Sequence, residues 1–143
     1  MRTFRQPLGL CLAAGLCLCS AACGNRPRDA VRKGPIIVLT DTTLTAGGSD
    51  TVRFGRLRSG EIAVQRIWIE NRATRPTAVV SYETSCGCTS LEFDTQPVVP
   101  GAAQCATLTF DSRGEYGWQF KTLDISLAGA SRPLRLFVEA EIE

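Results

Sequence analysis

Short segments in which apolar and polar residues alternate run through most of the chain. The clearest spans 106–110, where Ala106, Leu108 and Phe110 alternate with threonines. A period of two places alternate side chains on one face of a strand, so each such segment predicts a β-strand with one buried face. In segment 61–71 the apolar phase shifts midway. No window of ten or more residues shows the helical period of 3.6 residues, which limits the chain to an all-β fold.

Turn-forming residues separate these segments at the spacing of an all-β sandwich. Examples are Gly47-Gly48 and Pro100-Gly101. Seven or eight strands in this length predict an immunoglobulin-like antiparallel β-sandwich over residues 36–143, with a barrel as the alternative. Trp118 and Phe120 are expected to pack in its core or across its strands, with a binding patch as the alternative. The predicted strands occupy 36–39, 51–54, 61–71, 76–84, 91–93, 106–110, 119–127 and 134–142.

Residues 1–22 have the pattern of a secretory signal peptide. Two arginines, Arg2 and Arg5, precede the uncharged segment 8–22, which at 15 residues is too short to span a bilayer as a helix. The sequence Ser20-Ala21-Ala22-Cys23 resembles the bacterial lipobox, in which a cysteine is lipidated and becomes the mature N-terminus. Lipidation of Cys23 is therefore predicted. Because a serine replaces the usual leucine, ordinary signal-peptidase cleavage is the alternative.

Residues 23–35 are expected to form a lipidated cysteine followed by a flexible tether. The segment 24–35 is polar, is rich in arginine, proline and glycine, and shows neither apolar period. An acyl anchor at Cys23 makes the lipid bilayer an expected partner. Gly24 follows directly, in place of the aspartate that commonly retains lipoproteins at the inner membrane. We therefore expect a periplasm-facing protein of the bacterial cell envelope, at the outer membrane rather than the inner.

The chain has no histidine, which excludes Ser-His-Asp and Cys-His nucleophile pairs and His-ligated metal centres. Its 16 basic and 14 acidic residues give a formal charge of +2, too small a surplus for nucleic-acid binding. Removal of residues 1–22 takes away two arginines and leaves a neutral balance. We therefore predict a protein that is not an enzyme, needs no cofactor and binds no nucleic acid.

Three cysteines, Cys86, Cys88 and Cys105, lie in the predicted domain. Export to an oxidising compartment favours a disulfide. Cys86 and Cys88 could pair across Gly87, whose tolerance of positive φ would ease a small ring, or one of them could pair with Cys105. The phase of the alternation places Cys105 on the outer face of its strand. Redox-active thiols are an alternative, and although no metal site is predicted, two thiolates at this spacing suit Cu(I).

The segment Ser85-Cys86-Gly87-Cys88-Thr89 follows a predicted strand and is the most distinctive motif of the chain. Around it stand Phe54-Gly55, Gly60, Asn71, Pro76, Pro97, Pro100-Gly101, Phe110 and Lys121-Thr122. Together these residues, over Val52–Ile142, resemble the bacterial family known as domain of unknown function 1573. The resemblance implies an immunoglobulin-like domain in a secreted or lipid-anchored protein. It implies no biochemical role, since none is established for the family.

These observations favour a non-enzymatic, lipid-anchored envelope protein that acts as a protein-binding or scaffold module for an unidentified protein partner. Addition of a partner strand at an exposed sheet edge is the expected mechanism, because sandwiches of this type leave edges open. The alternative is a periplasmic thiol-dependent factor, either redox-active or Cu(I)-binding, that acts through Cys86 and Cys88.

Overall fold

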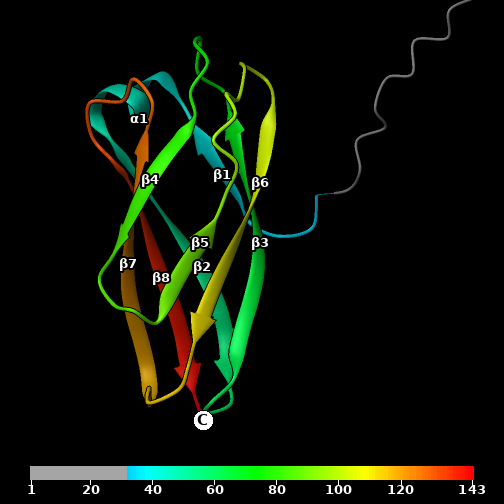
Figure 1. The fold of residues 1–143 in the computed structure, drawn as a ribbon, viewed down its shortest axis with the longest axis vertical. Helices are drawn as coiled ribbons and strands as arrows, with labels where there is room; N and C mark the ends of the chain where they lie inside the picture. The colour runs from blue at the N-terminus through cyan, green and yellow to red at the C-terminus, as the bar shows by residue number, and fades with distance from the viewer. Residues whose placement is uncertain (1–31) are drawn as a thin grey trace, which may run out of the picture. The chain divides into compact units, whose positions relative to one another are not determined.

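Segments of alternating residues form eight strands in the computed structural model, which describes residues 32–143 (Figure 1). One short helix lies between the first two strands. The predicted signal peptide, Cys23 and the tether as far as residue 31 lie outside the described residues. The elements are β1 (Ile36–Leu39), α1 (Asp41–Ala46), β2 (Gly48–Leu57), β3 (Ile62–Asn71), β4 (Val79–Thr84), β5 (Thr89–Glu92), β6 (Ala103–Asp111), β7 (Gly117–Leu127) and β8 (Leu134–Ile142).

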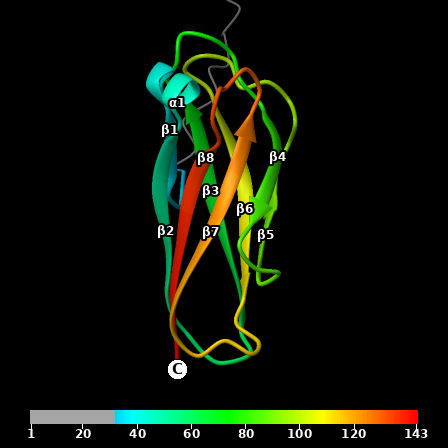
Figure 2. The same ribbon diagram turned by 90° about the vertical axis from the view of Figure 1, so that its left-hand side faces the viewer.

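The strands form two four-stranded sheets that pack face to face (Figure 2). Sheet A has the strand order β1-β3-β6-β5, and sheet B has the order β2-β8-β7-β4. Alternate residues from both sheets fill the core between them, which confirms the predicted all-β sandwich. The largest fully buried side chains are Phe110, Ile37, Leu39, Leu44, Ile67, Ile69, Leu108, Leu123, Ile125, Leu136, Val52 and Val79.

Two strand pairs are parallel, which the predicted antiparallel sandwich did not include. β1 runs parallel to β3, and β2 runs parallel to β8. The other four pairs are antiparallel. Each parallel pair lies at one edge of its sheet. Alternation reports which face of a strand is buried but not which way its neighbour runs, so the pattern could not distinguish the two arrangements.

The helix α1 has no periodic signal in the sequence because it spans only 6 residues, less than two turns. Thr40 is its N-cap, and a reciprocal pair of hydrogen bonds joins Thr40 to Thr43. The Thr40 hydroxyl accepts the Thr43 backbone N–H at 3.2 Å, and the Thr43 hydroxyl accepts the Thr40 backbone N–H at 3.2 Å. Leu44 is fully buried. The helix therefore serves as a capped, core-packed connection from sheet A to sheet B.

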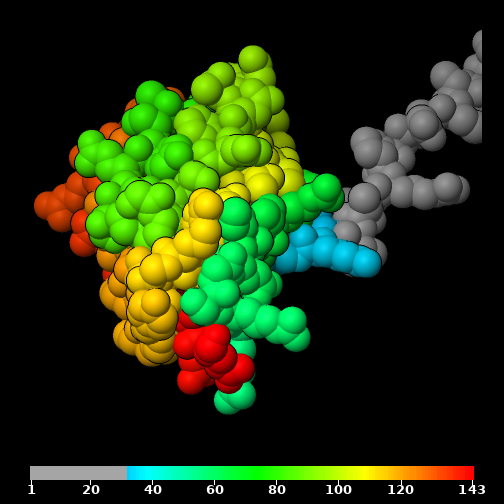
Figure 3. Space-filling model, turned by 60° about the horizontal axis from the view of Figure 1, so that its bottom comes forward, coloured from blue at the N-terminus to red at the C-terminus, as the bar shows by residue number. Residues whose placement is uncertain are grey.

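Turns and the chain end meet at the end of the domain opposite α1 (Figure 3). The Ser59 N–H donates to the Glu143 carbonyl at 3.0 Å, and the Ser112 N–H donates to the Glu61 carbonyl at 2.9 Å. The β2–β3 turn, the β6–β7 turn and the end of β8 therefore lie side by side.

Residues 32–35, the last four of the predicted tether, contact β3. The Trp68 backbone N–H donates to the Pro35 carbonyl at 2.8 Å. Gly34 has a φ of +115°, and a Cβ at this position would lie 2.1 Å from the Arg66 carbonyl oxygen, so only glycine fits there. Residues 32–35 are therefore held against β3, and the prediction that they belong to a flexible tether is wrong.

Candidate functional site

One edge of β3 is only partly covered. β1 pairs with β3 over residues 68–71, whereas β6 pairs along the other side of β3 for nearly its whole length. Alternate residues of an antiparallel strand direct their N–H and C=O groups toward the partner strand. Trp68 directs its N–H to Pro35 instead of to β6, so Val64 and Ile62, at even spacing from it, direct theirs to the same side. Within residues 32–143 no strand pairs with that side of β3 at Ile62 and Val64.

The same two residues expose apolar side chains on the outer face of sheet A. Ile62 is 54% exposed and Val64 is 62% exposed. The register of β3 with β6 is continuous, so no bulge causes the midway shift of apolar phase noted in the sequence. Instead, Ala63 and Gln65 face inward here, and the Gln65 Oε1 is buried with no hydrogen-bond partner among the described residues. This half of β3 therefore combines free backbone groups with an apolar surface.

The other sheet edges carry features that discourage pairing. β1 and β5 are each 4 residues long. The register of β4 with β7 skips Val80. β2 has a bulge between Arg53 and Gly55, and it exposes the charged side chains of Arg53 and Arg56. Short strands, bulges and charges are the means by which natural sheets avoid unwanted pairing. β3 is 10 residues long, and its segment Ile62–Gln65 has neither a bulge nor a charged side chain.

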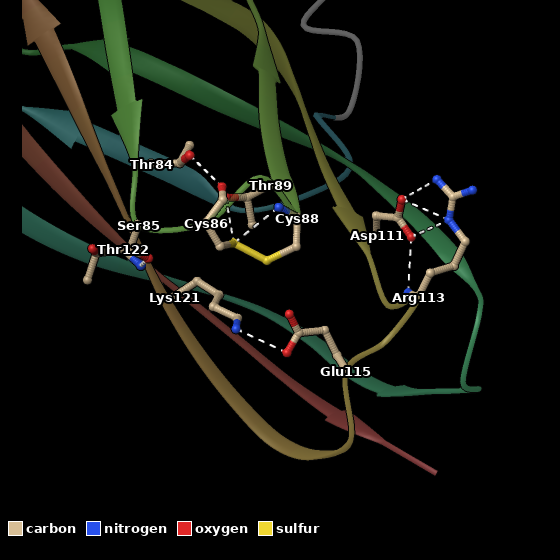
Figure 4. Close-up of a disulfide and its surroundings, with 10 residues drawn as sticks. All are labelled: Thr84, Ser85, Cys86, Cys88, Thr89, Asp111, Arg113, Glu115, Lys121 and Thr122. Atoms are coloured by element: carbon tan, nitrogen blue, oxygen red, sulfur yellow. Dashed lines mark hydrogen bonds and ion pairs between the residues drawn. A yellow bond between two sulfur atoms is a disulfide. The ribbon is translucent and has the colours of Figure 1, made fainter.

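A second candidate site is the loop between β4 and β5, where Cys86 and Cys88 form a disulfide (Figure 4). Cys105 is the free cysteine of the described residues and lies on the outer face of β6, as the alternation predicts. The Cys88 carbonyl accepts the Asp111 N–H, and Cys105 lies six residues from Asp111 along β6. Six residues of strand span about 20 Å, which excludes the alternative pairing with Cys105.

The disulfide ring closes without unusual backbone geometry at Gly87. The φ angle of Gly87 is not positive, so the expectation that a positive φ would ease the ring is wrong. A Cβ at Gly87 would meet no atom within 4 Å. The chain-entropy model gives a loop of three residues about 1.5 kcal/mol of stabilisation, roughly half of what a 15-residue loop receives. This bond therefore contributes little to fold stability.

The two sulfur atoms have different surroundings. The Cys86 Sγ accepts the Cys88 backbone N–H at 3.3 Å and lies 3.7 Å from the Thr89 hydroxyl. A disulfide sulfur carries no hydrogen, so the Thr89 hydroxyl is the donor of this contact. Cys88 instead packs against the hydrophobic core. The Thr84 hydroxyl donates to the Cys86 carbonyl at 2.6 Å and holds the loop in place.

The charged residues around the disulfide are paired with one another (Figure 4). The Lys121 ammonium bonds the Glu115 carboxylate at 3.1 Å, and only 19% and 24% of these side chains are exposed. The Arg113 guanidinium bonds the Asp111 carboxylate, and the Arg113 backbone N–H adds a further hydrogen bond; together they lower the pKa of Asp111 to about 2. Sequence inspection around the cysteines missed both pairs because they come from β6, β7 and the turn between them.

Trp118 and Phe120 form an aromatic cluster with Phe137 on the outer face of sheet B. Trp118 is 66% exposed and Phe120 is 45% exposed, so neither belongs to the core. Phe120 stacks on Trp118 at 5.7 Å between ring centroids and on Phe137 of the neighbouring strand at 5.2 Å. Phe120 therefore packs across strands, as predicted, whereas Trp118 contacts Phe120 along the same strand. Beside Trp118 lies a shallow pocket of about 190 Å³, which Arg53 and Arg56 also line.

The partly covered edge of β3 and the disulfide loop lie at the same end of sheet A. Ala63 of β3 pairs with Phe110 of β6, which pairs in turn with Thr89 beside the disulfide.

No group of three or more His, Cys, Asp or Glu residues within 32–143 is placed to hold a metal ion. In the same part of the chain, no helix has the length and apolar character needed to cross a membrane.

Comparison with known proteins agrees with this fold. A protein of unknown function from Porphyromonas gingivalis W83 matches with a TM-score of 0.57 at 20% identity, over 65% of this chain and 44% of that one. The secreted serine protease VesC from Vibrio cholerae matches with a TM-score of 0.50 at 10% identity, over 64% of this chain and 21% of that one. At such identities the likeness shows the fold alone. The match spans less than half of the length of each of these two relatives.

The sequence itself also identifies relatives. No curated protein matches it significantly. The model of the family described as "Protein of unknown function (DUF1573)" matches residues 46–142, well over half of the chain. This match includes β2 to β8, with both the partly covered strand edge and the disulfide loop. The chain therefore belongs to the DUF1573 family.

Proposed function

We propose that this protein is a non-enzymatic binding module of the bacterial envelope, and that it captures an extended segment of another protein along β3. The observation that carries this proposal is the segment Ile62–Gln65, which joins unpaired backbone groups to an apolar outer surface. Strand addition of this kind draws affinity from backbone hydrogen bonds and specificity from alternate side chains. The bound segment would continue sheet A below the end of β1.

The chemistry of the edge defines the partner that fits it. Ile62 and Val64 lie on the outer face, so the partner needs apolar side chains at alternate positions to cover them. Full burial of one such side chain contributes about 1.5 to 3 kcal/mol. Arg66, exposed at the upper end of the open segment, favours an acidic residue next to the apolar ones. The expected partner segment is therefore short, extended, apolar at alternate positions and acidic at one end.

The substitution Val64→Pro tests this mechanism. The Val64 N–H points away from β6, so proline removes a donor of the open side and obstructs an added strand while the β3–β6 ladder stays intact. The matched control is Val80→Pro, which changes an exposed valine that the β4–β7 register skips. Capture of a partner from envelope extracts should be lost with Val64→Pro and retained with Val80→Pro. Equal capture by both variants, or no partner for the unchanged protein, would contradict the proposal.

We further propose that a lipid group on Cys23 holds the module at the periplasmic side of a membrane, the outer membrane in particular. The support is the sequence Ser20-Ala21-Ala22-Cys23 after an uncharged segment, followed by Gly24. The Cys23→Ala variant should move from the carbonate-washed membrane fraction to the soluble fraction. Retention of that variant in the membrane fraction would reject the anchor.

A further inference from the structure

We propose that the Cys86–Cys88 disulfide is a redox centre that oxidises dithiols, and that Cys86 is the sulfur which leaves as a thiolate. This goes beyond the binding function proposed for β3, because it uses a different loop and makes a covalent change. The geometric basis is the unequal surroundings of the two sulfurs: hydrogen-bond donors face Cys86, whereas Cys88 packs on the core.

The donors at Cys86 are placed to stabilise a negative charge. The Cys88 backbone N–H at 3.3 Å and the Thr89 hydroxyl at 3.7 Å both reach the Cys86 Sγ. Thr89 is 5% exposed, so its hydroxyl is screened from water and oriented by its strand. Hydrogen bonds to a charged acceptor are stronger than those to a neutral one, so both contacts gain strength when Cys86 becomes a thiolate. A sulfur packed against apolar side chains favours the neutral thiol instead.

The rest of the loop is held so that the donors keep their positions. The Ser85 N–H donates to the Thr122 carbonyl at 2.9 Å, and the Ser85 hydroxyl accepts the Thr122 N–H at 2.9 Å. These two bonds fix the loop to β7 next to Lys121. Two ion pairs, Lys121–Glu115 and Arg113–Asp111, lie around the disulfide, and neither pair adds a net charge (Figure 4). The local hydrogen bonds, rather than a free cation, therefore supply the stabilisation.

The reaction follows from this asymmetry. A thiolate of a substrate dithiol attacks the Cys88 Sγ, the Cys86–Cys88 bond breaks, and Cys86 leaves as the thiolate. The second substrate thiol, after loss of its proton, attacks the mixed disulfide and expels Cys88, which takes up a proton. The substrate dithiol loses two electrons and two protons and becomes a disulfide, and the protein gains them as a dithiol once Cys86 is protonated. Stabilisation of the reduced form makes the protein disulfide the stronger oxidant.

Site-resolved alkylation tests the assignment. Iodoacetamide reacts with thiolates, so the ratio of the alkylation rate at pH 7 to that at pH 10 reports the thiolate fraction and cancels differences in access. Two variants of the full chain are compared. The Cys88→Ser variant leaves the Cys86 thiol to be measured, and the Cys86→Ser variant leaves the Cys88 thiol. Peptide mass spectrometry separates each thiol from the other cysteines. We expect the ratio for Cys86 to exceed that for Cys88 by about tenfold or more. A ratio for Cys86 that does not exceed that for Cys88 overturns the proposal.

Two further variants separate the sulfur contact from general disruption of the loop. Thr89→Val, added to Cys88→Ser, keeps the buried shape but removes the donor, and should lower the Cys86 ratio about threefold. Thr84→Val, also added to Cys88→Ser, removes a hydroxyl that reaches the Cys86 carbonyl and not its sulfur. It should change the Cys86 ratio by less than about twofold relative to Cys88→Ser alone. In the unchanged protein, excess reduced glutathione should open the disulfide, because only structural disulfides resist that reductant. A disulfide that stays closed under these conditions also overturns the proposal.

Discussion

Asn71 joins three parts of the domain through one buried side chain. It is fully buried at the end of β3, and its Nδ2 donates to the carbonyls of Arg75 and Val98 at 2.9 and 2.8 Å. Its Oδ1 accepts the Ala73 N–H at 2.9 Å. The Asn71 carbonyl also accepts the Gly101 N–H at 2.7 Å. This network explains why an asparagine at the end of a strand and a Pro-Gly turn occur together in the sequence.

The substitution Asn71→Ala should destabilise the domain by about 3 kcal/mol. It leaves the buried Ala73 N–H without its acceptor, and such a group costs about 1 to 3 kcal/mol. It also removes the Asn71 bonds to the carbonyls of Arg75 and Val98, although the Val98 carbonyl keeps the Thr77 N–H at 3.2 Å. Urea denaturation measures the change. Arg72→Ala is the control, because it removes only a surface ion pair with Glu70 and should cost less than about 1 kcal/mol. Equal destabilisation by the two substitutions would contradict this role for Asn71.

At the residue scale, the sequence predicted the cysteine motif and the outward position of Cys105 but not the contacts that distinguish the two sulfurs. Thr89 follows Cys88 directly, yet its hydroxyl reaches the Cys86 sulfur only because the loop turns back on itself. Lys121 lies in the surroundings of the disulfide because β7 pairs with β4. Contacts made by such turns and pairings depend on tertiary structure, which alternation alone does not encode.

At the scale of elements, β3 shows how much the alternation contains. Its apolar phase shift is visible in the sequence. In the structure the shift coincides with the end of the pairing with β1, because Ile62 and Val64 lie on the outer face beyond that point. The alternation also predicted most of the strands within a few residues. It missed α1, which is too short to show a period. It also could not report that β1 runs parallel to β3 and that β2 runs parallel to β8.

Gly34 sets the place where the covered part of β3 ends. Its φ of +115° and the close approach of the Arg66 carbonyl leave no room for a Cβ. The substitution Gly34→Ala should therefore detach residues 32–35 and break the bond from the Trp68 indole N–H to the Lys33 carbonyl, which is 3.2 Å long. Acrylamide quenching of Trp68 fluorescence, measured with Trp118→Phe present, should increase. Gly87→Ala is the control with open space around its Cβ, and an equal increase in that variant would refute this explanation.

At the scale of the whole molecule, acid should unfold the domain in a defined range of pH. Hydrogen bonds and ion pairs to arginines or to Thr74 lower the pKa of four carboxyl groups, and that of Asp111 falls to about 2 because of Arg113. When the pKa of a carboxyl group is lower in the folded state than in the unfolded state, its ionised form stabilises the folded state. This stabilisation is complete at a pH above the unfolded pKa of about 4. It is lost as the pH falls through the pKa of the folded state. The four groups are Asp41, Glu70, Asp111 and Asp124.

The urea midpoint should accordingly stay nearly constant between about pH 5 and pH 8 and fall between about pH 4 and pH 2. The sequence contains no histidine, which is the side chain that ordinarily titrates in the upper range. Asp111→Asn should remove part of the acid-induced fall, because the substituted amide cannot ionise. A midpoint that already declines between pH 8 and pH 5 would contradict the prediction.

The parallel pairing of β2 with β8 also determines when the domain can fold. β8 lies between β2 and β7 in sheet B, and all of β3 to β7 separates β2 from it in the sequence. During synthesis β2 therefore emerges long before β8, its partner within residues 32–143, and sheet B cannot close until β8 is available. Pairing over such sequence distances is slow, since the intervening chain must be ordered first. A growing chain of this protein thus remains open for most of its synthesis, which is the state in which a polypeptide can still be threaded through a narrow channel.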